Sequence, residues 1–109
     1  MSTIDQIRNA VQIFKQQDCL FELQHSNSTY PMKLEEVNIR CIKTLRKEFN
    51  CDVGYSGHED SSYNVCLLAA ALDATSIERY ITLNRSMYGS DQAASLERPG
   101  LERLVRDLR

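Results

Sequence analysis

The sequence predicts an α/β fold in which parallel strands alternate with helices. Segments with helical periodicity alternate with short apolar or β-branched segments, and both the first and the last segment are helical. Strands separated in this way are joined by right-handed crossovers and lie parallel. The chain of 109 residues, 42% hydrophobic and 26% charged, has the usual size and composition of one domain.

The first two helices are predicted from apolar stripes. Ser2 to Asp5 reads as a capping box in which Ser2 accepts a hydrogen bond from the backbone near Asp5. The apolar residues that follow at helical spacing are Ile4, Ile7, Val11 and Phe14. A second stripe predicts a helix from Leu34 to about Glu48, with apolar positions at Leu34, Val37, Cys41, Leu45 and Phe49.

The remaining elements are three strands and two helices. The predicted strands are Cys19 to His25, Cys51 to Ser56 and Thr75 to Leu83. A polar loop over 57–62 leads to an Ala-rich helix over Val65 to Ala74, and a last helix begins near Pro99. A closed eight-stranded barrel needs about 250 residues, so the strands form either a small open sheet or part of a barrel. Helices on one face only would indicate the barrel.

Charge and hydropathy exclude several classes of function. The 13 Lys and Arg against 15 Asp and Glu give a formal charge of -2, so no basic excess exists for nucleic acid or anionic membranes. The longest apolar run, Val65 to Leu72, is far shorter than the about 20 residues that span a bilayer, and no signal peptide opens the chain. The four cysteines form no C-x-x-C pair, which predicts buried free thiols. We expect a cytoplasmic protein.

Polar residues follow each predicted strand, where parallel α/β folds place their ligands. The residues concerned are His25 to Tyr30, Ser56 to Asp60, and Asn84, Arg85, Tyr88 and Asp91. Hydroxyls, histidines, an arginine and carboxylates would converge on one rim. Such a rim could hold a phosphorylated or polyhydroxylated ligand, or it could be a solvated edge without a ligand.

Four segments in order cover nearly the whole chain and carry a resemblance. They are M-S-T-I-D-Q-I-R-N-A-V at the start, S-T-Y-P-M-K-L-E-E-V-N-I from Ser28, V-G-Y-S-G-H-E from Val53, and A-T-S-I-E-R-Y-I-T-L-N-R-S-M-Y-G-S-D-Q-A-A-S-L-E from Ala74. Together they resemble the sialic acid synthase family, whose members condense phosphoenolpyruvate with an N-acetylated sugar into nine-carbon acids. The resemblance implies a partial TIM (β/α)8 barrel, from helix five to helix eight, as one domain over residues 1–109. We expect the first five strands, with a lysine and a glutamate used around phosphoenolpyruvate, and the family's antifreeze-like domain to be absent.

The resemblance also implies roles for five residues. Tyr30 matches a substrate-side tyrosine and Asp91 matches an aspartate that contacts the acceptor sugar, so both are candidate catalytic residues. Ser56 matches a serine that faces the phosphate of phosphoenolpyruvate, and Ser28 matches a position where several members carry a ligand-contacting asparagine. His58 matches the family's first metal-binding histidine.

The family's second metal-binding histidine falls at Tyr80 in this chain. A phenol with a pKa of about 10 is a poorer ligand for a divalent cation at neutral pH than an imidazole. The resemblance implies a divalent metal, manganese or magnesium, as cofactor. With His58 as the single imidazole we expect weak binding or none.

Two functions remain open. One is a sialic acid (nonulosonate) synthase that condenses phosphoenolpyruvate with an N-acetylated sugar aldehyde, for which this chain alone is incomplete. The other is a catalytically silent barrel remnant that acts as an interaction or structural module. In both cases we expect a homo-oligomer or a complementary barrel half. A three-stranded slice has two open edges, and its inner face is predicted to bear Phe21, Leu23, Val53 and Ile77.

Overall fold

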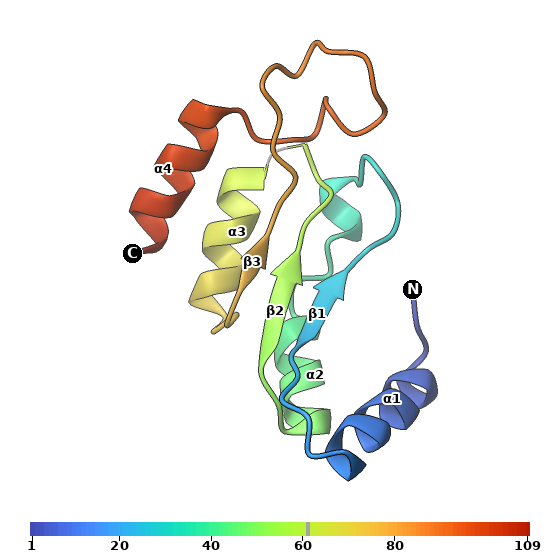
Figure 1. The fold of residues 1–109 in the computed structure, drawn as a ribbon. Helices are drawn as coiled ribbons and strands as arrows, with labels where there is room; N and C mark the ends of the chain where they lie inside the picture. The colour runs from blue at the N-terminus through green and yellow to red at the C-terminus, as the bar shows by residue number, and fades with distance from the viewer. Residues whose placement is uncertain (61) are drawn as a thin grey trace.

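A computed structural model describes residues 1–60 and 62–109 (Figure 1). Its elements, in chain order, are α1 (Ile4–Gln16), β1 (Leu23–Ser26), the 3-10 turn η1 (Leu34–Glu36), α2 (Cys41–Phe49), β2 (Val53–Ser56), α3 (Ser62–Ala71), β3 (Ile77–Glu78) and α4 (Arg98–Leu108). The predicted alternation of helices and strands is confirmed. Ser61, in the loop predicted over 57–62, lies outside the described residues.

The three strands form one parallel sheet in the order β1-β2-β3. Leu23 pairs with Val53, Ser26 with Ser56, and Ser56 in turn with Glu78. The parallel direction agrees with the prediction from the sequence. Since all three strands run the same way, their carboxyl ends meet at one edge of the sheet, which lies at the top of Figure 1.

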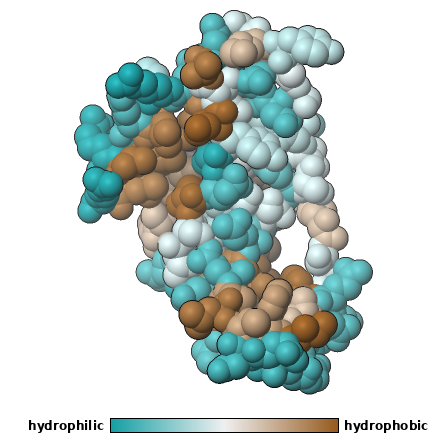
Figure 2. Space-filling model, viewed as in Figure 1, coloured by the Kyte–Doolittle hydropathy of each residue, from teal (hydrophilic) through white to brown (hydrophobic). Residues whose placement is uncertain are grey.

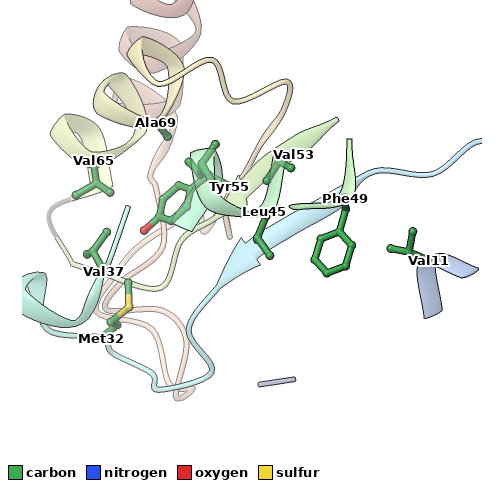
Figure 3. Packing of buried hydrophobic residues seen from close by; sticks show 10 residues of the cluster. Val11, Met32, Val37, Leu45, Phe49, Val53, Tyr55, Val65 and Ala69 are labelled. Carbon is green, nitrogen blue, oxygen red and sulfur yellow. The ribbon is translucent and has the colours of Figure 1, made fainter. Parts of the chain in front are cut away.

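The core lies on one face of the sheet, between the strands and the helices α2 and α3 (Figure 3). Val53 and Tyr55 are fully buried, and they point to the same side because alternate residues of a strand do. Leu45 of α2 and Val65 and Ala69 of α3 belong to the same buried cluster. Both helices therefore cover one face, which is the arrangement of a barrel wall and not of a doubly wound sheet.

Helix α1 packs on α2 and starts one residue later than the sequence predicts. Thr3, not Ser2, is the N-cap, and it forms a capping box with Gln6. Val11 is the buried residue of this helix and joins the core that contains Phe49. The Lys15 ammonium also donates a hydrogen bond to the backbone carbonyl of Phe49 at 3.3 Å. The N-terminal helix is thus fixed to the end of α2.

The predicted second helix is interrupted. A turn of 3-10 helix covers Leu34–Glu36, and α2 begins only at Cys41. Asn38 between them has a φ of 46°, in the left-handed region, where a right-handed helix cannot continue. A second asparagine in this region, Asn50 with a φ of 48°, ends α2.

The strands are shorter than predicted, and the third helix lies earlier in the chain. Strand β1 starts at Leu23 because pairing with β2 begins there, and Leu20 in the predicted strand is fully exposed. Strand β3 keeps only Ile77 and Glu78. Helix α3 ends at Ala71, before Asp73, whose φ of 65° again lies in the left-handed region.

The prediction of an apolar inner face is wrong. Leu23, Val53 and Ile77 all lie on the helix side, in or against the core, and Phe21 packs against the same core. We call this side, with Leu23, His25, Val53, Tyr55, Ile77 and Arg79, the helix face. The opposite side is the polar face, formed by Glu22, Gln24, Ser26, Gly54, Ser56, Ser76 and Glu78. In Figure 2 hydrophilic and neutral atoms cover the strands, while hydrophobic atoms gather over α1 and beside α3 and α4.

The cysteines are unpaired but differ in burial. Cys66 is buried, Cys41 and Cys51 are half-buried, and Cys19 is exposed, so the prediction of buried thiols holds fully only for Cys66. Burial raises the pKa of the Cys66 thiol to about 11. Among the described residues, no helix has the length and apolar character that crossing a membrane requires.

Candidate functional site

Three loops meet at the carboxyl edge of the sheet and are tied together by their backbones. Met32, in the loop after β1, donates its N–H to the carbonyl of His58 at 3.0 Å. Gly57 donates to Glu78 at 3.3 Å, and Leu96 donates to Tyr80 at 2.9 Å. The rim that the sequence predicts is therefore formed, and the loops after all three strands contribute to it.

Three aromatic rings, one from each loop, form a cluster on this rim. The rings of His58 and Tyr80 are stacked, with centroids 5.7 Å apart and an interplanar angle of 18°. The Tyr30 ring lies edge-on to His58 at 5.2 Å and 5.6 Å from Tyr80. We call Tyr30, His58 and Tyr80 the aromatic cluster. The phenol of Tyr80 thus lies directly beside the imidazole of His58, and 42% of Tyr80 is exposed.

His58 is oriented by a backbone carbonyl. Its Nδ1 lies 2.6 Å from the carbonyl oxygen of Asn27. A carbonyl can only accept, so Nδ1 carries the proton and donates, which leaves Nε2 as the acceptor of the neutral ring. Asn27 belongs to the predicted rim, but the group that contacts His58 is its backbone carbonyl and not its side chain, which the sequence does not reveal.

Tyr30 and Asp91 are brought together, but not through the Asp91 carboxylate. The Tyr30 hydroxyl donates to the Asp91 backbone carbonyl at 2.6 Å, and the Ser95 hydroxyl donates to the same oxygen at 2.6 Å. Burial raises the pKa of Tyr30, so its phenol stays protonated at neutral pH. The exposed side chain of Asp91 accepts a hydrogen bond from the Ser90 hydroxyl at 2.9 Å. Its carboxylate remains accessible to a ligand.

Ser56 lies on the polar face and is already bound to a carboxylate. Its hydroxyl donates to Oε2 of Glu78 on the neighbouring strand at 2.6 Å. A phosphate placed at Ser56 would therefore meet the negative charge of Glu78. Ser28 is exposed, and no hydrogen bond to its side chain is formed by the described residues.

A buried polar network, missed by the sequence reasoning, lies behind the aromatic cluster on the helix face. Arg79 Nη1 and Glu59 Oε1 are 2.8 Å apart, with side chains 3% and 0% exposed. The Tyr55 hydroxyl donates to the other oxygen of Glu59 at 2.7 Å. Burial, and then this contact with Glu59, raises the pKa of Tyr55, which keeps the phenol protonated. The alternation of Glu78 and Arg79 in the strand predicts that one of the two charges points into the barrel interior and needs a partner. The structure instead places Arg79 on the helix face, and nothing in the sequence identifies Glu59 as its partner.

A comparison with protein families finds a match over the whole chain. The NeuB family matches residues 1–109, the whole chain. The chain belongs to the NeuB family. It is 39% identical over 110 residues to N-acetylneuraminate-9-phosphate synthase from Homo sapiens, covering 100% of this chain and 30% of that protein. It is also 39% identical over 87 residues to N,N'-diacetyllegionaminic acid synthase from Campylobacter jejuni, covering 80% of this chain and 26% of that protein.

A solved structure confirms the fold class. The N-acetylneuraminic acid synthetase from Leptospira borgpetersenii, crystallised with citrate, superposes with a TM-score of 0.93 at 34% identity. The match covers 99% of this chain and 38% of that chain. The fold is thus the predicted part of a TIM barrel. The chain spans about a third of the length of these relatives.

The metal that the family resemblance implies does not fit the residues present. Within residues 1–60 and 62–109 no group of three or more His, Cys, Asp or Glu side chains is placed to hold a metal ion. The free Nε2 of His58 offers one ligand, and the neighbouring ring is the phenol of Tyr80. Divalent cations of this type need several protein ligands.

Proposed function

We propose that this chain forms one wall of a nonulosonate synthase barrel that condenses phosphoenolpyruvate with an N-acetylated sugar aldehyde. Membership of the NeuB family supports a synthase-like role in sugar biosynthesis. The observation that carries the finer proposal is the meeting of the three loops, which gathers Tyr30, His58 and Asp91 at the edge where Ser56 ends β2. Ligands of barrel enzymes bind at this edge.

In the proposed reaction C3 of phosphoenolpyruvate attacks the aldehyde carbon and forms the new carbon–carbon bond. The aldehyde oxygen takes up a proton and becomes a hydroxyl. Water then adds at C2 and gives up one proton, which leaves a hydroxyl there. The C2–O bond to phosphate breaks with its electron pair leaving on inorganic phosphate, and the C2 hydroxyl loses its proton to form the carbonyl. The aromatic cluster forms a boundary against which the carbon chain of the acceptor sugar packs. The accessible carboxylate of Asp91 binds the hydroxyls of this sugar. Ser56 faces the phosphate once cationic side chains from a partner offset the negative charge of Glu78. Tyr30, anchored on the Asp91 carbonyl, fixes the distance between two of these loops.

The charges of the polar face indicate that this wall acts with a partner. Glu22 and Glu78 lie on it, and no Lys or Arg of the described residues does. Phosphoenolpyruvate is strongly anionic, so cationic side chains must come from outside this wall to bind it. A groove of about 650 Å³ also separates α1 from the unpaired edge of β1. We propose that a complementary barrel half, or a second copy of the chain, supplies these cationic side chains and fills this groove.

A silent remnant is the second candidate, and one observation favours it. Tyr80 stacks on His58 where the resemblance implies a second imidazole. An oriented metal ion supplies several kcal/mol of transition-state stabilisation in Lewis-acid chemistry. Without it, a barrel of this kind would keep its fold and lose most of its turnover.

A segment exchange tests the two candidates. The matched 110 residues of the human relative are replaced by this chain, with Tyr80 and with Tyr80→His. Phosphate release from phosphoenolpyruvate is measured with an N-acetylhexosamine-type acceptor, with and without manganese. We expect Tyr80→His to raise the metal-stimulated rate by orders of magnitude, and Tyr80→Phe, the matched control, to leave it unchanged.

The outcomes separate the candidates. Equal, metal-stimulated rates with Tyr80 and with Tyr80→His would refute the argument from the two histidines. A folded exchange protein that condenses nothing in either form would refute the synthase proposal and support the silent module. For the partner, sedimentation of the isolated chain should show self-association, and a stable monomer at high concentration that gains no complex with the complementary half would exclude both proposed partners.

A further inference from the structure

The buried ion pair and the aromatic cluster are adjacent in sequence on two different loops. Glu59 directly follows His58, and Arg79 directly precedes Tyr80. The Arg79 guanidinium reaches across the sheet edge, and its Nη2 donates to the backbone carbonyls of Glu59 at 2.7 Å and of Ala94 at 3.1 Å. The buried side chain of Arg79, directly after β3, therefore holds both the loop after β2 and the loop that leads to α4.

Gly57 leaves the space through which this guanidinium passes. A Cβ at Gly57 would lie 2.2 Å from Arg79 Nη1, 2.7 Å from Glu59 Oε2 and 2.8 Å from the Tyr55 ring. No real side chain tolerates such distances. Tyr55, Gly57 and Glu59 lie at alternate positions on the helix face, and Arg79 fills the place of the missing side chain between the other two.

The alternation of the extended backbone links this contact to the site. Ser56 pairs with Glu78 in the sheet, so continuing the register sets Gly57 beside Arg79 and His58 beside Tyr80. Residues at successive positions point to opposite sides. Once Arg79 is bound to Glu59 on the helix face, His58 and Tyr80 must face each other on the other side, as their stacked rings do.

The chemistry of the pair is more specific than core packing requires. Two apolar side chains of similar volume fill a core without the cost of removing charges from water. Here a planar guanidinium contacts one carboxylate and two carbonyls from three directions, which a lysine or an apolar residue cannot reproduce. A polar network of this kind fixes one geometry, whereas apolar contacts permit several.

We propose that Arg79, held over Gly57 by Glu59, is the positioning residue that sets the spacing of His58 and Tyr80 in the aromatic cluster. The inference concerns the site of the proposed function but does not depend on its reaction. Arg79 lies on the helix face and binds the backbones of the rim loops from that side, at Glu59 and Ala94, so it acts on the aromatic cluster through the neighbouring residues His58 and Tyr80.

The test measures the ring stacking directly, by NMR of the imidazole protons of His58 in the full chain. The stacked Tyr80 ring shifts these signals, and Tyr80→Leu gives the reference position without it. Arg79→Lys keeps the charge and loses the fork that reaches the carbonyls of Glu59 and Ala94. We expect it to move the His58 signals at least half of the way to the Tyr80→Leu reference. Arg85→Lys, at the exposed pair with Asp60, is the matched control and should leave them in place.

A second variant separates positioning from folding. Tyr55→Phe, Glu59→Met and Arg79→Met together remove every side-chain polar group of the network, so no buried charge is left unpaired. We expect this variant to retain the parent's helical circular dichroism and to lose the His58 stacking shift. Parent-like His58 signals would overturn the proposal. So would loss of the fold, because the network would then be a requirement for folding and not a positioning device. Neither readout needs turnover, so failure of the synthase proposal leaves this test intact.

Discussion

The helix face and the polar face of the sheet are built from alternate residues of the same strands and differ in side-chain polarity and charge. Val53 and Tyr55 are fully buried against α2 and α3. On the other side, the Ser56 hydroxyl donates to Glu78, and neither residue belongs to the apolar core. The two faces therefore have different roles. Apolar burial on the helix face stabilises the fold, and polar groups on the polar face are available to a ligand or partner.

Two charged residues depart from this division of the faces. Arg79 and Glu59 are charged and lie on the helix face, yet they are among the most buried side chains of the chain. They lie at the end of the sheet where the loops of the rim begin. The charges of Arg79 and Glu59 are thus buried where they determine the geometry of the rim.

The largest expected effect comes from a large truncation on the helix face. Tyr55→Ala should lower the free energy of unfolding by about 3–5 kcal/mol, because it leaves a cavity and removes the hydroxyl that binds Glu59. Urea unfolding followed by circular dichroism measures it. Ser26→Ala, on the polar face of the neighbouring strand, is the control and should stay within about 0.5 kcal/mol of the parent. Equal losses of unfolding free energy for the two variants would show that the two faces contribute equally to stability.

An intermediate loss of stability is expected at Gly54 on the polar face, where a side chain does not fit. A Cβ at Gly54 would lie 2.2 Å from Ser76 Oγ and 3.0 Å from the Ser76 carbonyl. Gly54→Ala should therefore destabilise the chain by about 1–3 kcal/mol in the same urea experiment. At Gly100 in α4 the nearest atom to a Cβ is 3.4 Å away, so Gly100→Ala should instead stabilise by about 0.5–1 kcal/mol. A Gly54→Ala protein as stable as the parent would show that the polar face adapts freely.

The smallest effect concerns a solvent-accessible contact between the outer helices. Hydrogen bonds from Arg106 and from the Tyr63 hydroxyl lower the pKa of Asp107 to about 2. A carboxyl whose folded pKa is lowered contributes stability above its unfolded pKa and loses it as the pH falls through the folded value. The parent should therefore lose its small advantage over Asp107→Asn between about pH 4 and pH 2. Thermal unfolding at both pH values measures the difference, and an advantage that grows with acidity would reverse the assigned sign.

Local patterns in the sequence determined the order of the elements. Apolar residues at helical spacing around Val11 and Leu45, and β-branched residues around Ile77, specify helices and a strand by chemistry that acts within a few residues. Parallel strands follow from that order, because a helix between two strands returns the chain to the same end of the sheet. Polar residues after each strand then placed the rim that contains Tyr30 and His58.

Tertiary structure decided the rest, because it depends on contacts between residues far apart in the chain. A period of two shows that Val53 and Tyr55 share a face, but only packing shows that this is the face that the helices cover. The left-handed turn at Asn38, which divides the predicted second helix, depends on how the chain is held on both sides of it. The pairing of Glu59 with Arg79 joins two strand ends, and nothing local at either residue reveals its partner. The sequence thus determined which side chains reach the rim, and the tertiary contacts decided how those side chains face one another.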